Sequence, residues 1–86
     1  MSVLSNLKSS LNFAVEMCQK YTSLYKEWQH NSINKLNDYC KQKITTEEYC
    51  QFIHSYNRVL LQYEYWLSQK DWLAFRLNEE AKKCRL

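Results

Sequence analysis

Apolar residues recur along the first third of the chain in alternating steps of three and four residues. The opposite positions are mostly polar, a pattern typical of an amphipathic helix with a wide apolar face. The pattern predicts a helix over about residues 3–30. The apolar stripe consists of Leu4, Leu7, Leu11, Ala14, Cys18, Tyr21, Tyr25 and Trp28.

The apolar register shifts by one position after Trp28. Ile33, Leu36 and Cys40 form a new stripe that is out of phase with the first. The shift coincides with residues 29–32, which combine moderate helix propensity with two good helix-capping residues. We therefore expect a break or kink at residues 30–32 and a short second helix over about residues 33–42.

A helix start is encoded directly after this region. Thr45 followed three residues later by Glu48 fits a capping box, in which Thr45 is the N-cap. Ile44 and Tyr49 stand at the two positions of a hydrophobic staple. The chain is therefore expected to turn at residues 43–45 and to begin a new helix near Thr46.

The last helix is predicted over about residues 46–83. Two long helices joined by a short turn pack antiparallel, and residues whose numbers sum to about 89 then face each other. This register places Trp28 beside Leu60 and Leu61. The main apolar stripe of the last helix consists of Ile53, Tyr56, Leu60, Tyr63, Leu67, Ala74, Leu77, Ala81 and Cys84.

The predicted fold class is therefore all-α. We expect one domain, residues 1–86, built as an antiparallel helical hairpin of two long helices. The break or short extra helix before the turn makes it a variant of the three-helix bundle. Both stripes are wider than a two-helix seam, so a third layer should cover them. That layer is the short helix folding back, a second copy that completes a larger bundle, or a partner protein.

The complete lack of glycine and proline in 86 residues supports this fold and argues against catalysis. No glycine-rich loop is present to hold a phosphate group. Cys50 and His54 share one helical face and could be imagined as nucleophile and base. However, two short connections leave little loop from which to build a concave pocket. We expect a protein that is not an enzyme and needs no cofactor.

Three residues near the expected turn allow more than one chemistry. Cys40, Cys50 and His54 could be free thiols with a bystander histidine, a Cys40–Cys50 disulfide with that histidine, or metal ligands. No apolar run reaches the length of a membrane span, and the first residues lack the apolar core of a secretion signal. Free thiols, no bound metal, no membrane association and a cytoplasmic location are the expectations.

A second apolar patch lies off the main face of the last helix. Its members are separated by four, seven and three residues, which places them roughly opposite the main stripe. A patch rich in tryptophan and tyrosine has the composition of a binding hot spot. Partner binding or self-association is one interpretation. The other is cover within the chain, by a packed third helix or by the helix at residues 33–42. The candidate partner-binding residues are Leu61, Tyr65, Trp72 and Phe75.

The charge balance leaves a second function class open. The net charge of +3 arises from twelve basic and nine acidic residues, and the basic residues are scattered among aromatic ones. Exposed aromatic and basic side chains could bind nucleic acid, although most aromatics follow the period of the core. The sequence favours a small non-catalytic protein–protein interaction protein, such as a chaperone, immunity protein, inhibitor or assembly subunit. The alternative is a helical nucleic-acid-binding protein.

Overall fold

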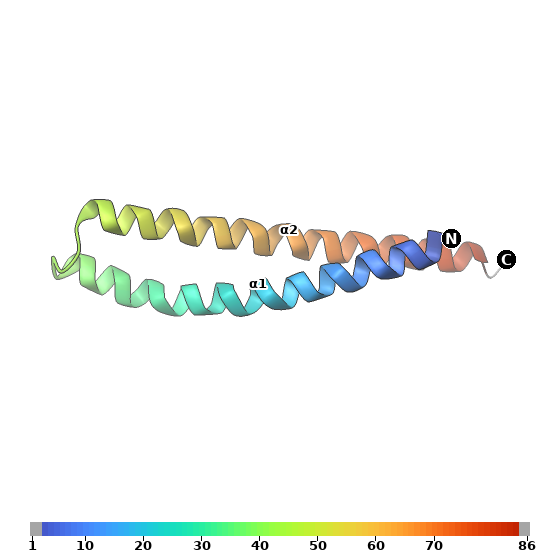
Figure 1. Cartoon of the computed structure of the whole chain (residues 1–86), viewed down its shortest axis with the longest axis horizontal. Helices are drawn as coiled ribbons and strands as arrows, with labels where there is room; N and C mark the ends of the chain where they lie inside the picture. Colours follow the sequence, from blue (N-terminus) through green and yellow to red (C-terminus); the bar gives the residue numbers. More distant parts are fainter. Residues whose placement is uncertain (1–2, 85–86) are drawn as a thin grey trace. The chain divides into compact units, whose positions relative to one another are not determined.

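Two long helices make up nearly all of the computed structural model, which describes residues 3–84. Helix α1 spans Val3–Cys40 and helix α2 spans Thr46–Cys84, with a turn at residues 41–45 between them (Figure 1). The described residues contain no strand. The prediction of an all-α helical hairpin is thereby confirmed.

The hairpin divides into two compact units, and each helix contributes a segment to both. The first unit pairs the described residues up to Lys20 with those from Glu64 onward. The second unit consists of Tyr21–Tyr63 and therefore contains the turn. Within each unit, a segment of α1 packs against a segment of α2. The expectation that all 86 residues form one domain stays a prediction.

Helix α1 is continuous through residues 29–33, so the predicted break and the separate helix at residues 33–42 are wrong. The Ser32 hydroxyl donates a 2.6 Å hydrogen bond to the Gln29 carbonyl oxygen, which holds Ser32 inside the helix instead of at a cap. The shift in register changes which residues face α2. Ile33 and Leu36 consequently remain 62% and 47% exposed.

The turn ends α1 with a Schellman motif that uses glutamine in place of glycine. Gln42 adopts a left-handed conformation with φ of 60°. Its backbone N–H donates to the Tyr39 carbonyl oxygen at 3.0 Å, and the Lys43 N–H donates to the Asp38 carbonyl oxygen at 2.8 Å. These two bonds satisfy carbonyl groups that the helix end leaves without partners.

Replacing Gln42 with glycine should stabilise the protein, because glycine adopts a positive φ without the steric penalty of a Cβ atom. The expected gain is about 0.5–1 kcal/mol in the free energy of unfolding, measured by urea denaturation. The neighbouring change Lys41→Gly is the control and should destabilise, because Lys41 has no positive φ to relieve. A loss of stability in Gln42→Gly would show that the glutamine side chain contributes more than its backbone costs.

Helix α2 begins as the capping box predicts. The Glu48 backbone N–H donates to the Thr45 hydroxyl oxygen at 3.1 Å, and the Thr45 hydroxyl lies 3.3 Å from the Glu48 carboxylate. Tyr49, assigned to a staple with Ile44, stacks its ring on Tyr39 at 4.7 Å between ring centroids. The Tyr39 hydroxyl also shares a 3.1 Å hydrogen bond with the Thr46 hydroxyl. An aromatic stack thus joins the two helix ends at the turn.

Aromatic rings also form the seam between the helices farther along the second unit. The Tyr25 ring lies between Tyr56 and Tyr63, with centroid distances of 5.8 and 5.2 Å. Trp28 stacks on Phe52 at 5.2 Å. Its predicted placement beside Leu60 and Leu61 stays a prediction.

The first unit contains the two residues of the described part of the chain that are buried. Ala14 is fully buried and Cys18 is 5% exposed, and these are the buried apolar residues among those described. The Phe13 ring meets Trp66 edge to face at 5.4 Å. A core this small leaves most apolar side chains of the described residues half-buried or exposed.

Candidate interaction surface

Three of the predicted partner-binding residues lie together on α2 in the first unit. Tyr65 is 51% exposed, Trp72 55% and Phe75 60%. Because each residue of an α-helix advances by about 100°, positions 65, 72 and 75 fall on one side of α2, away from the side that faces α1. We call these three residues the outer aromatic face.

Leu61, the fourth predicted residue, belongs to the second unit. Its side chain is 63% exposed. It precedes Tyr65 by one turn along the continuous helix α2.

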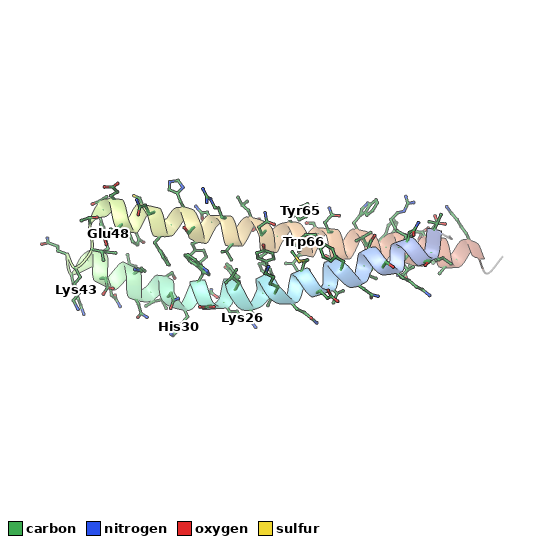
Figure 2. The ribbon with its side chains drawn as sticks, in the orientation of Figure 1. Lys26, His30, Lys43, Glu48, Tyr65 and Trp66 are labelled. Atoms are coloured by element: carbon green, nitrogen blue, oxygen red, sulfur yellow. The ribbon has the colours of Figure 1, made fainter. Side chains whose placement is uncertain are left out.

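Tyr65 is held by an aromatic neighbour that reaches toward α1. Tyr65 and Trp66, both labelled in Figure 2, contact each other edge to face at 5.0 Å. Trp66 in turn contacts Phe13. Trp66 is half-buried, and its indole nitrogen is buried without a hydrogen-bond acceptor. An unpaired buried donor costs free energy, so packing of the large ring must offset that cost. Phe13, which contributes this contact from α1, is itself 52% exposed.

The Trp72 ring makes a cation–π contact with Arg76. The Arg76 guanidinium carbon lies 5.5 Å from the centre of the Trp72 ring, within the range of a cation–π contact. Arg76 also lies 3.9 Å from a Glu80 carboxylate oxygen, one helical turn farther on. These contacts order the indole while leaving more than half of it accessible.

The continuity of α1 excludes cover of the patch by a separate short helix at residues 33–42. Cover by a separate short helix required residues 33–42 to fold back, and residues 33–40 instead continue α1 within the second unit. In that unit Ile33 and Leu36 form a further exposed apolar pair. The signal for this pair was present in the sequence as the one-residue shift in register after Trp28.

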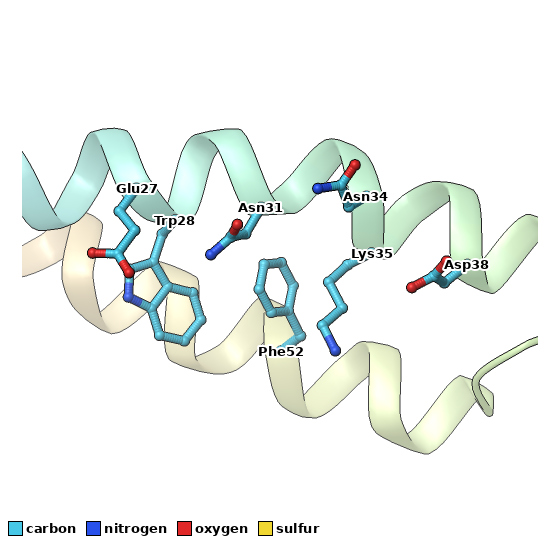
Figure 3. A pocket seen from close by; sticks show the side chains of 7 residues that line it. All are labelled: Glu27, Trp28, Asn31, Asn34, Lys35, Asp38 and Phe52. Carbon is cyan, nitrogen blue, oxygen red and sulfur yellow. The ribbon is translucent and has the colours of Figure 1, made fainter.

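A shallow cleft in the second unit was not anticipated. Its volume is about 340 Å³, and the stacked Trp28 and Phe52 rings form its apolar part (Figure 3). The Lys35 ammonium lies 6.0 Å from the centre of the Phe52 ring. The remaining lining residues are Glu27, Asn31, Asn34 and Asp38. The cleft combines both signs of charge around an aromatic floor.

The cysteines near the turn are free thiols in the structure. Cys40 and Cys50 are exposed and unpaired, and Cys18 is unpaired and buried. Within residues 3–84, no group of three or more histidine, cysteine, aspartate or glutamate side chains is placed to hold a metal ion. His54 is exposed on α2.

Tyr56 is the described group with a perturbed pKa. Partial burial, followed by hydrogen bonding to and charge repulsion from the Tyr25 hydroxyl, raises the pKa of Tyr56 above 10.0, and a hydrogen bond with Ser32 opposes the shift. Folding therefore favours the neutral phenol. This contribution to stability is complete below pH 10 and is lost as the pH rises through the pKa of the folded protein.

Neither helix has, within the described residues, a stretch long and apolar enough to cross a lipid bilayer. Comparison of the chain with protein-family models, with curated proteins and with solved structures finds no significant match. The function must therefore be argued from the exposed helix faces themselves.

Proposed function

We propose that this chain is a small non-catalytic protein–protein interaction protein that binds through the outer aromatic face of α2. The supporting observation is the exposure of Tyr65, Trp72 and Phe75 on the side of α2 away from α1. Tryptophan and tyrosine dominate the energetics of protein interfaces because their large rings lose much accessible surface on binding.

The small core strengthens this proposal. Ala14 and Cys18 are the apolar side chains that the described residues bury, whereas eight large apolar residues are exposed. Covering such side chains with a protein surface is favourable by about 25 cal/mol for each Å² removed from water. A binding partner thus supplies the burial that the hairpin lacks.

The proposed roles are those of a chaperone, immunity protein, inhibitor or assembly subunit, and the occupant is another protein or a second copy of this chain. The free thiols of Cys40 and Cys50 suit a reducing compartment such as the cytoplasm. Nucleic-acid binding is less favoured, because the basic residues are scattered along the chain and the rings of Tyr25, Trp28 and Tyr39 stack on rings of α2.

Replacing Trp72 with alanine should abolish partner capture while leaving the helices intact. Loss of a hot-spot tryptophan costs about 2 kcal/mol or more, equivalent to roughly a 30-fold weaker dissociation constant. The test is affinity capture from the native host with quantitative mass spectrometry, in which untagged copies of the chain are counted together with other proteins. Circular dichroism of each variant verifies the helix content.

The control is Gln19→Ala, because Gln19 is exposed on α1 in the same unit and lies outside the outer aromatic face of α2. Capture should survive this change. If Trp72→Ala and Gln19→Ala capture the same proteins in equal amounts, the outer aromatic face is not the binding surface.

A further inference from the structure

The outer aromatic face continues a spacing that is characteristic of helix–helix seams. Tyr65, Ser68, Trp72 and Phe75 follow one another in steps of three, four and three residues, and all four are exposed. This alternation is the heptad spacing with which a neighbouring helix packs along a left-handed coiled coil. In heptad terms, Tyr65 and Trp72 occupy a positions, and Ser68 and Phe75 occupy d positions.

The two edges of this seam carry opposite charges. Glu64 and Asp71 occupy the g positions on one edge, and both are exposed. Arg76 and Lys83 occupy the e positions on the other edge and are also exposed. An occupant must therefore present a basic edge to the first side and an acidic edge to the second.

Extending the proposed function, we propose that the occupant is a second copy of this chain, with the two α2 helices parallel and in register. In a parallel pair, each g residue faces the e residue of the next heptad of the partner, so Asp71 of each copy lies opposite Arg76 of the other. An antiparallel pair would instead bring the acidic edges of both copies together. The charges thus make the seam complementary to itself in the parallel orientation alone.

Residue sizes along the seam fit the same arrangement. A two-fold axis parallel to α2 places Trp72 beside its symmetry mate and Phe75 beside its own. Ser68, one step before Trp72, is small and leaves space into which the large indole rings can tilt. The Tyr65 hydroxyl stays at the edge of the seam, where water reaches it.

A charge exchange tests this dimer. Association is measured by sedimentation equilibrium for the full chain and for Asp71→Arg, Arg76→Asp and the double variant that carries both changes. Each single change should weaken dimerisation by at least about fivefold, because it places like charges opposite one another. The double variant should recover the affinity of the unmodified chain to within about twofold.

The matched control for Asp71→Arg is Glu16→Arg, which makes the same change in net charge at an exposed position of α1. It should leave dimerisation unchanged. Because Arg76 also contacts Trp72 and Glu80 within its own chain, helix content is recorded for every variant.

A second measurement stands independently of Arg76. In a chain with Cys40, Cys50 and Cys84 changed to serine, Ser68→Cys should form a disulfide between copies under mild oxidation, because the two-fold axis places the two positions side by side. Cys18 is kept, since it is buried. Failure of this cross-link in a chain that still dimerises would overturn the parallel register.

The remaining outcomes separate this proposal from the proposed function. A monomer at about 100 μM overturns the second copy as the occupant, and tighter association of Asp71→Arg overturns the parallel orientation. In another outcome, Trp72→Ala prevents dimerisation, but the double charge variant dimerises no more tightly than the weaker of the two single variants. The aromatic face then forms the dimer, but the proposed pairing of Asp71 with Arg76 is wrong. If the chain captures a different protein through Trp72 while monomeric, the proposed function stands and the dimer does not.

Discussion

Replacing Tyr25 with alanine is expected to lower the free energy of unfolding by about 2–4 kcal/mol. The Tyr25 ring lies between Tyr56 and Tyr63 and contacts both, so its loss removes two aromatic pairs and leaves a gap between the helices. Small domains have a total stability of about 5–15 kcal/mol, so the variant should lose a large share of it. Thermal unfolding followed by circular dichroism should show a midpoint lower by about 10–20 °C.

Two controls separate the ring from its hydroxyl and from helix propensity. Tyr25→Phe keeps the ring and removes the hydroxyl that interacts with Tyr56, which should cost about 1 kcal/mol or less. Lys26→Ala changes the adjacent exposed residue and should stay within about 0.5 kcal/mol of the unmodified chain. A Tyr25→Ala variant as stable as Lys26→Ala would mean that the aromatic seam does not hold the second unit together.

Replacing Ala14 with leucine should destabilise the first unit by about 1–3 kcal/mol, although leucine is a good helix former. Ala14 is fully buried, and a longer side chain at that position must push the facing segment of α2 away. The displacement should also disturb the nearby contact between Phe13 and Trp66. Urea denaturation with tryptophan fluorescence reports both the stability and this local change.

The control for overpacking is Asn12→Leu, an increase in size at an exposed position of the same segment. Helix propensity alone predicts that it is neutral or slightly stabilising. If Ala14→Leu were as stable as Asn12→Leu, the helices would have room at Ala14 and the first unit would lack a tight contact there.

Features that depend on neighbours along one helix were predictable from the sequence. The start of α2 after Thr45 follows from capping chemistry that involves only four successive positions. The exposure of Tyr65, Trp72 and Phe75 follows from the constant rotation of about 100° per residue.

The continuity of α1 was not predicted, because the moderate helix propensity and the capping residues at positions 29–32 were given more weight than the cost of ending one helix and starting another. Residues 29–32 lower helix propensity by only a few tenths of a kcal/mol each. Ending a helix and starting another leaves up to four backbone carbonyls and four N–H groups to be satisfied by other means. Ser32 avoids that cost by bonding to the Gln29 carbonyl within the helix.

Features that depend on which residues of α1 and α2 pair with each other could not be predicted from the sequence. The partner of Trp28 is set by how many residues the turn consumes and by how far an indole side chain reaches along the seam. The turn spans residues 41–45, longer than the predicted residues 43–45, so α1 ends earlier than expected. The cleft beside Trp28 and Phe52 depends on that pairing and was unpredictable for the same reason.

The aromatic stack at the turn also bears on the order in which the hairpin folds. Tyr39 and Tyr49 are close in sequence, so bringing their rings together closes a short loop at a small entropic cost. Each later pair, from Trp28 with Phe52 to Phe13 with Trp66, encloses a longer stretch of chain. The two helices are therefore expected to pair first at the turn and then progressively toward their far ends.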